Sequence, residues 1–170
     1  RRNFIRNATL GTAALTVGGV LPGFSSKSYS RIVGANEKLV VSVMGVNSRG
    51  KALAMNFAAQ TNCEVAHICD VDSRAIIACQ EAIKSRQTNQ AKGFGDFRQS
   101  LESKDIDALV VAAPDHWHAP ASLLAMQAGK HVYVEKPCSH NPHEGEMLVE
   151  AAVRYKKVVQ MGNQRRSWPN

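Results

Sequence analysis

Short apolar runs alternate with segments of helical periodicity along most of the chain. The runs are continuous instead of alternating between apolar and polar residues, which is typical of strands covered on both faces. Strands separated by helices favour a parallel sheet with right-handed crossovers. We therefore predict an α/β fold with a doubly wound parallel sheet. The predicted strands are 38–46, 63–70, 106–114, 130–137 and 157–162, and the predicted helices are 50–60, 73–86, 97–104, 120–129 and 143–156, with a loop or short strand at 91–97.

Apolar residues that recur every three or four positions mark the faces of two helices that should be buried. They are Ile76, Cys79 and Ile83 on the second helix and Met147, Ala151 and Tyr155 on the last one. The four cysteines form neither a C-x-x-C motif nor a disulfide framework. We expect Cys63, Cys69 and Cys79 to be core thiols.

The composition is that of an ordinary globular protein, with 44% apolar and 21% charged residues among 170. The formal net charge of +7 would be compatible with nucleic-acid binding. However, four of the basic residues fall in the first thirty positions, where no Asp or Glu occurs, so the rest of the chain carries +3. No basic stripe interleaved with aromatic residues is present, and we expect no nucleic-acid partner.

The first 34 residues differ from the rest and predict a leader with a short linker. Arg1 and Arg2 open the segment "RRNFIR", which resembles a twin-arginine export signal. Residues 8–24 are weakly apolar and rich in Gly and Thr, so we expect no stable membrane span. The protein is expected to be periplasmic or exported, with a frayed basic tail as the alternative for this segment. A dinucleotide-binding domain is then predicted at 35–164, and 165–170 begin the connection to a further domain.

A glycine-containing turn follows the first predicted strand and opens the first helix. The segment "GVNSRG" matches a dinucleotide fingerprint from Gly45 to Gly50, with Asn47 in place of the middle glycine. Twenty residues beyond Gly50, Asp70 ends the second predicted strand, where a carboxylate can accept hydrogen bonds from the adenosine ribose. This order predicts NAD as the cofactor, with NADP possible because of the nearby Arg74. The alternative is a tight turn followed by a carboxylate that only caps a helix.

Together with these two features, three further motifs resemble one known family. They are "APDHWHA", "AGKHVYVEKP" and "VQMGNQRRS", in the same order and spacing. The chain resembles the oxidoreductases of the glucose-fructose oxidoreductase and inositol dehydrogenase type (Gfo/Idh/MocA). The resemblance implies an N-terminal Rossmann domain followed by a C-terminal α/β domain that carries much of the substrate site. We expect that second domain to be missing from the 170 residues.

The resemblance also implies a site at the carboxyl ends of the strands. Glu135 is expected near the nicotinamide ribose, and a partly buried Lys136 near the carbon that exchanges the hydride, before a Pro137 bond that is often cis in this family. A solvated surface pair is the alternative. The histidines of "APDHWHA" have no metal-site spacing, so no metal is expected. The candidate cofactor-binding residues are Gly45, Asn47, Ser48, Arg49, Gly50, Asp70, Asp115, Trp117, His118, Glu135, Lys136 and Asn163, and the candidate catalytic residue is Lys136.

The predicted function is hydride transfer between NAD(P) and a sugar or cyclic polyol. An exported enzyme of this kind must keep its cofactor, because free nicotinamide cofactor is not expected outside the cytoplasm. An NAD-dependent, redox-neutral glycoside hydrolase meets the same demand and is the alternative. A non-catalytic cofactor-binding module or an inactive fragment is the second alternative. The full-length protein is expected to be a homo-oligomer.

Overall fold

The computed structural model describes residues 38–164. The strands within this range are β1 (Leu39–Met44), β2 (Cys63–Cys69), β3 (Lys92–Phe94), β4 (Ala108–Val111), β5 (His131–Glu135) and β6 (Val159–Gly162). The helices are α3 (Arg49–Ala58), α4 (Ser73–Lys84), α5 (Phe97–Leu101), α6 (His118–Gln127) and α7 (Pro142–Tyr155), and the 3-10 helix η1 (Asp115–Trp117) directly precedes α6. The predicted leader at 1–34 and the predicted connection at 165–170 lie outside the described residues.

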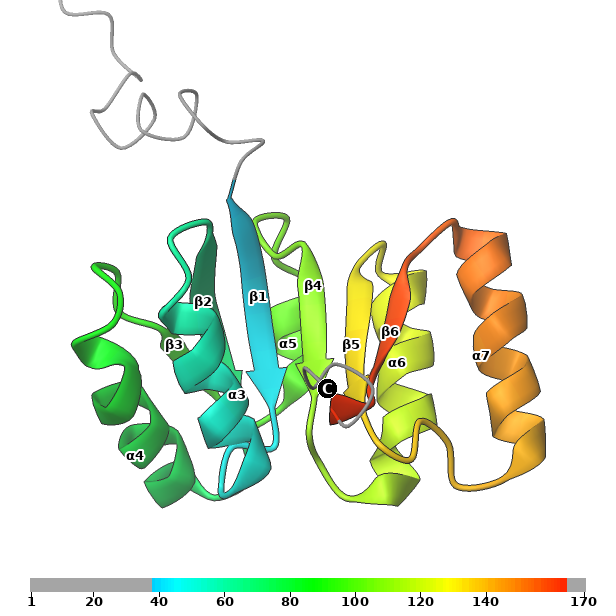
Figure 1. Cartoon of the computed structure of the whole chain (residues 1–170), viewed down its shortest axis with the longest axis horizontal. Coiled ribbons are helices and arrows are strands. Elements are labelled where there is room, and N and C mark those ends of the chain that lie inside the picture. Colours follow the sequence, from blue (N-terminus) through cyan, green and yellow to red (C-terminus); the bar gives the residue numbers. More distant parts are fainter. Residues whose placement is uncertain (1–37, 165–170) are drawn as a thin grey trace, which may run out of the picture. The chain divides into compact units, whose positions relative to one another are not determined.

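The strands form one parallel sheet in the order β3-β2-β1-β4-β5-β6. The chain moves outward from β1 to β3, returns to place β4 beside β1, and then moves outward on the other side to β6. The predicted doubly wound α/β fold is therefore confirmed. The segment 91–97, which was predicted as a loop or short strand, contains a three-residue strand. The connection after β1 leads toward one edge of the sheet and the connection after β4 leads toward the other. Ligands of open parallel sheets bind where two neighbouring strands differ in this way, outside their carboxyl ends. In Figure 1 these ends are the arrowheads on the lower side of the sheet.

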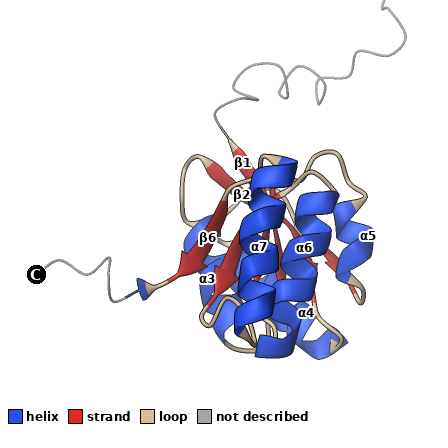
Figure 2. Ribbon diagram, turned by 90° about the vertical axis from the view of Figure 1, so that its right-hand side faces the viewer, coloured by secondary structure: helices blue, strands red, loops and turns tan. Residues whose placement is uncertain are grey.

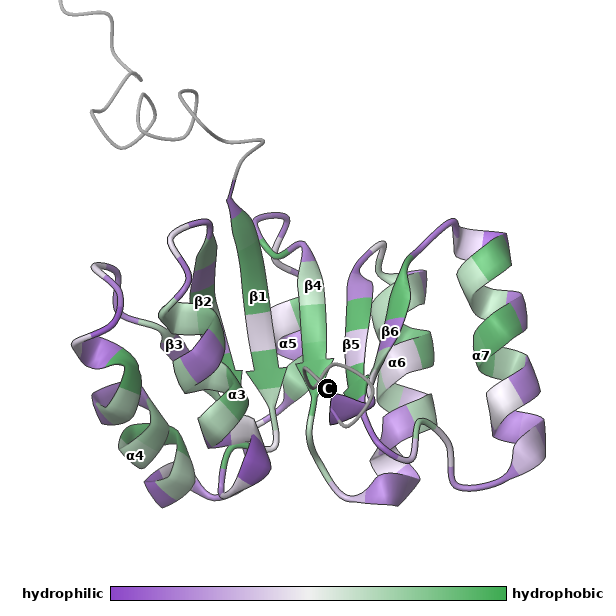
Figure 3. Ribbon diagram, in the orientation of Figure 1, coloured by the Kyte–Doolittle hydropathy of each residue, from purple (hydrophilic) through white to green (hydrophobic). Residues whose placement is uncertain are grey.

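Helices cover both faces of the sheet, and each face has its own core. On one face α3 and α4 pack over Val41, Val43 and Val110. On the other face α5, α6 and α7 pack over Leu109 and Val111. Figure 2 shows α5, α6 and α7 on one side of the strands and α3 on the other side. Successive residues of β4 point to opposite faces, so all four are buried, and the strand is apolar along its length in Figure 3.

The predicted buried faces of the helices are largely confirmed. Cys79 and Ile83 are fully buried on α4, and Cys63 and Cys69 are buried in β2. On α7 the prediction was wrong for Met147, which is 39% exposed. The buried residue of that turn is the neighbouring Leu148, so the face of α7 that meets the core passes through Leu148 and Ala151. No helix among residues 38–164 is both long enough and apolar enough to cross a membrane.

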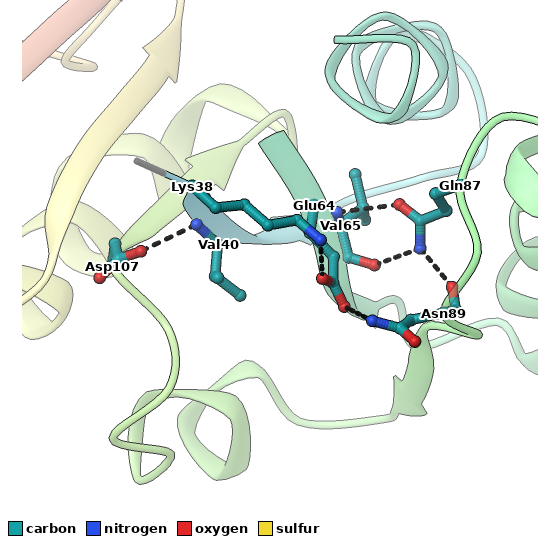
Figure 4. A network of polar contacts seen from close by, with 7 residues as sticks. All are labelled: Lys38, Val40, Glu64, Val65, Gln87, Asn89 and Asp107. Atoms are coloured by element: carbon teal, nitrogen blue, oxygen red, sulfur yellow. Dashed lines mark hydrogen bonds and ion pairs between the residues drawn. The ribbon is translucent and has the colours of Figure 1, made fainter. Parts of the chain in front are cut away.

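Polar side chains at the amino ends of the strands bond to one another and to the backbone (Figure 4). Asp107 accepts a hydrogen bond from the Val40 N–H at 2.8 Å, which ties the start of β1 to the start of β4. The amide of Gln87 bonds to both the N–H and the C=O of Val65 at 3.0 and 2.9 Å. Strand β3 pairs with β2 only from His67 onward, so Gln87 replaces the missing strand neighbour of Val65.

Candidate cofactor site

The fingerprint turn after β1 depends on glycine at two positions. Gly45 has a φ of +81°, and a Cβ there would lie 2.6 Å from the Ala113 nitrogen. A Cβ on Gly50 would lie 2.0 Å from the Gly45 carbonyl oxygen, so both glycines permit close backbone approach. Asn47 keeps a negative φ, because the left-handed conformation is supplied by Gly45.

Helix α3 begins directly after this turn without a side-chain cap. Its N-cap residue Ser48 makes no capping hydrogen bond, as is also the case at the start of α6, whereas α4, α5 and α7 are capped by Asp72, Asp96 and Asn141. The first N–H groups of a helix attract anions, and a capping side chain would compete for them. Asn47, Ser48 and Arg49 are exposed beside these groups. The arrangement suits the pyrophosphate of a dinucleotide.

Asp70 follows β2 and is held in place by the backbone. One carboxylate oxygen accepts from the Val46 N–H at 2.8 Å and the other from the Asp72 N–H at 3.0 Å. Each oxygen can accept a further hydrogen bond, since a carboxylate oxygen has two lone pairs. Asp70 lines a cavity of about 470 Å³ together with Gly45 and Trp117. Three predicted site residues are thus brought to one cavity.

The far wall of this cavity comes from a segment that was not predicted as part of the site. Gly95, Phe97 and Arg98 line it, and the Phe97 ring meets Trp117 edge to face with centroids 6.1 Å apart. The sequence signal was the position of "GDFR" directly after β3, at the carboxyl edge of the sheet. It was missed because the segment was predicted only as a loop or short strand, and no ligand contact was assigned to the residues after it.

The two arginines near the cavity already bond to carboxylates, whereas an arginine that binds the 2′-phosphate of NADP would be expected to be free. Arg74 does not line the cavity, and its guanidinium bonds to both oxygens of Asp72. Arg98 lines the cavity but bonds to both oxygens of Asp96. A 2′-phosphate would have to compete with a carboxylate for either guanidinium.

Glu135, at the end of β5, is buried and held by two side chains. Its carboxylate accepts from Arg49 Nε at 2.9 Å and from Gln164 Nε2 at 3.0 Å to each oxygen. Burial alone would raise the pKa of Glu135, but the hydrogen bonds from Arg49 and Gln164 outweigh burial and lower it. The contact with Arg49 joins β5 to the fingerprint helix α3 across the carboxyl edge of the sheet.

Lys136 is exposed, so the expectation of a partly buried lysine was wrong. The strand ends at Glu135, and the next residue already belongs to a turn at the rim. The Lys136–Pro137 peptide bond is cis, as the resemblance implied. At this rim the side chain bears no cost of burial.

The remaining predicted residues lie in the loops after β4 and β6. Asp115 is exposed and Trp117 is 42% exposed. His118 is only 2% exposed, and both of its ring nitrogens contact backbone carbonyl oxygens. Asn163 is exposed, and its N–H donates to the Met161 carbonyl. No cluster of metal-ligating side chains is found within residues 38–164.

Comparison with known proteins agrees with this geometry. Residues 39–163 match the family described as "Oxidoreductase family, NAD-binding Rossmann fold" (GFO_IDH_MocA). Myo-inositol dehydrogenase from Lactobacillus casei, solved in complex with NAD(H) and myo-inositol, is similar with a TM-score of 0.69 and 27% identity, over 76% of this chain and 38% of that one. The chain belongs to the Gfo/Idh/MocA oxidoreductase family, and the described residues form its NAD-binding Rossmann domain.

Curated relatives carry a different kind of name. A glycosyl hydrolase family 109 protein from Saccharopolyspora erythraea is 30% identical, over 96% of this chain and 39% of the relative. An α-N-acetylgalactosaminidase from Shewanella oneidensis is 28% identical, over 95% of this chain and 38% of the relative. The chain thus spans less than two fifths of the length of these two relatives.

Proposed function

We propose that this chain is the cofactor-binding part of an enzyme that transfers a hydride between NAD and a carbon of a sugar or cyclic polyol. The proposal rests on one observation, the 2.9 Å contact between Arg49 and Glu135. It links the helix that follows the dinucleotide turn to the residue directly before Lys136. The lysine is thereby held at the same edge of the sheet as the cofactor cavity.

Each part of the site has a chemical task in this reaction. The uncapped start of α3 binds the pyrophosphate, and Asp70 accepts hydrogen bonds from the adenosine ribose. Bound NAD supplies the hydride acceptor. Lys136 hydrogen-bonds the substrate hydroxyl and accepts its proton as the hydride leaves the adjoining carbon, so that the hydroxyl becomes a carbonyl. The same contact favours the reverse reaction by protonating the developing alkoxide.

A redox-neutral glycoside hydrolase is the second candidate, and the names of the two curated relatives favour it. Such an enzyme removes a hydride from the sugar, eliminates the leaving group, adds water in its place and returns the hydride to the product. The first step is the same as in the oxidoreductase, so NAD, Asp70 and Lys136 keep their tasks. The two candidates differ only in the steps after the first hydride transfer.

The products distinguish these candidates. The full-length protein would be incubated with sugars, cyclic polyols and aryl glycosides, while the absorbance of reduced nicotinamide and the release of aglycone are followed. Net oxidation or reduction of a sugar or polyol supports the oxidoreductase. Aglycone release without net change of the cofactor supports the hydrolase. Binding of NAD with no turnover of any substrate would reject both and leave a cofactor-binding module.

The destination and assembly of the protein form part of the same proposal. We propose export by the twin-arginine route, because the segment "RRNFIR" precedes a domain that can fold before transport. Replacing Arg1 and Arg2 by lysine should retain the protein in the cytoplasm, as followed by cell fractionation. Unchanged export would exclude this route. We also propose a homo-oligomer for the full-length protein, which light scattering would test.

A further inference from the structure

His118 occupies a position between two loops of the site, and its side chain faces both of them. It is the first residue of α6 and is 2% exposed. Nδ1 lies 2.5 Å from the carbonyl oxygen of Pro137, which follows Lys136. Nε2 lies 2.8 Å from the carbonyl oxygen of Ala113, in the loop after β4. One imidazole therefore spans the gap between the end of β4 and the end of β5.

The same loop after β4 is fixed from its other side. The Ala113 nitrogen lies where a Cβ on Gly45 would come within 2.6 Å, so this peptide is packed against the fingerprint turn. Its carbonyl oxygen contacts His118. A continuous series of contacts therefore runs from the fingerprint turn through Ala113 and His118 to Pro137.

These contacts argue against a direct role of the imidazole in cofactor binding. Carbonyl oxygens accept hydrogen bonds, so a ring nitrogen that bonds to one of them must carry a hydrogen; a neutral imidazole has one such N–H, and an imidazolium has two. With both nitrogens directed at carbonyls and almost no exposed surface, the ring has no free polar group to offer a ligand. Its neighbour Trp117, by contrast, lines the cofactor cavity.

We propose that His118 is a positioning residue that holds the turn carrying Lys136 at a fixed place relative to the cofactor. This inference rests on the proposed hydride transfer by Lys136. The imidazole fixes the carbonyl of the residue after the lysine, and thereby the backbone from which the ammonium extends. A displacement of about 1 Å in such a group can cost a factor of about 100 in rate. Loss of the imidazole should therefore affect kcat more than cofactor affinity.

The test compares His118→Ala and His118→Gln with His116→Ala in the full-length protein. His116 lies two residues away but is exposed, so its removal controls for a change in the same loop. The carboxamide of glutamine can still donate to one of the two carbonyls. Three quantities are measured for each variant: kcat, the Kd for NAD by calorimetry, and the deuterium exchange of backbone amides in residues 135–141.

His118→Ala should lower kcat by about 10- to 100-fold, change the Kd for NAD by less than about threefold, and speed exchange in 135–141 by about tenfold. His118→Gln should recover part of both losses, and His116→Ala should behave as wild type. If the alanine variant does not fold, His118→Gln alone decides by the same quantities. Wild-type exchange in 135–141, or a rise in Kd that equals the fall in kcat, would overturn the proposal. A wild-type protein without turnover would reject the proposed function, while the exchange comparison would still decide whether His118 holds the turn.

Discussion

The two ends of the same parallel sheet use polar residues in different ways. At the amino ends, side chains bond to each other and to backbone groups, as Gln87 does with Val65 and Lys130 does with the Ser103 and Ile106 carbonyls. At the carboxyl ends, α3 begins without a side-chain cap and Asp70 faces a cavity. Polar groups at the amino ends complete the fold, whereas at the carboxyl ends the start of α3 and Asp70 leave bonding capacity for a ligand, beside helix caps that also complete the fold.

Glu135 also serves the fold, and its bonds show how the site is held in place. It lies at a carboxyl end, yet it is 5% exposed and bonds to Arg49 and Gln164. A buried carboxylate is stable only when such partners replace its water. By holding Glu135, the protein fixes the strand end from which the exposed Lys136 extends. One residue of the pair stabilises the site, and we propose that the other performs chemistry there.

The largest expected effect is a loss of activity on changing a lysine at the carboxyl ends of the strands, but not one at the amino ends. Lys136→Ala in the full-length protein should lower kcat by about two to four orders of magnitude while NAD still binds, the usual contribution of a positioned acid-base group. Lys104→Ala is the matched control, because this exposed lysine lies in the loop before β4, at the amino ends. Full activity of the Lys136→Ala enzyme would remove this lysine from the mechanism.

A change at the amino ends should affect stability alone. Gln87→Ala removes the side-chain partners of both polar groups of Val65 and should lower the free energy of unfolding by about 2 kcal/mol, with the Kd for NAD unchanged. Chemical denaturation and calorimetry measure the two quantities. A variant that loses NAD affinity but keeps its stability would show that the amino ends also serve the ligand.

Glu135 predicts an acid dependence of stability. Its folded pKa is lowered by Arg49 and Gln164, so it contributes stability above the ordinary carboxyl pKa of about 4.3 and loses it as the pH falls through the folded value. Glu135→Gln should therefore be less stable than wild type at pH 7, and the two unfolding curves should converge below about pH 4. Glu150→Gln, an exposed change on α7, should show no such convergence. A difference that persists unchanged at low pH would mean that the charge of Glu135 is not what stabilises it.

The smallest expected effect concerns the altered fingerprint. Asn47→Gly restores the missing glycine, but Asn47 is exposed and has an ordinary negative φ. We therefore expect the Kd for NAD to fall by less than about threefold. Tightening by more than about tenfold would mean that the asparagine side chain obstructs the pyrophosphate.

Features that depend on local pattern could be predicted from the sequence. The order of strands and helices, the glycine turn and the position of Asp70 all follow from periodicity and spacing, and the structure has them where expected. Helix starts were less certain. Helix α6 begins at His118, two residues before the predicted start at Pro120, because a proline in the first turn removes only an N–H that has no partner within the helix.

Features that depend on contacts distant in sequence could not be predicted. The bond from Arg49 to Glu135 spans 86 positions, and the two carbonyls that His118 contacts belong to different loops. No periodicity signals such contacts. The exposure of Lys136 likewise depends on where β5 ends relative to its neighbours, which is a property of the assembled sheet.

The division between the two ends is tested most directly by making one chemical change at both. Asp70→Asn and Asp107→Asn each replace a carboxylate that accepts a backbone N–H, the first at the carboxyl ends and the second at the amino ends. Calorimetric titration of both variants with NAD and NADP gives the comparison. Asp70→Asn should raise the Kd for NAD by about tenfold and reduce the preference for NAD over NADP, because the ribose hydroxyls lose an anionic acceptor and a 2′-phosphate loses a repulsive one. Asp107→Asn should leave both affinities as in wild type. Wild-type NAD affinity in Asp70→Asn, or an equal loss in both variants, would contradict the assignment of the carboxyl ends as the cofactor site.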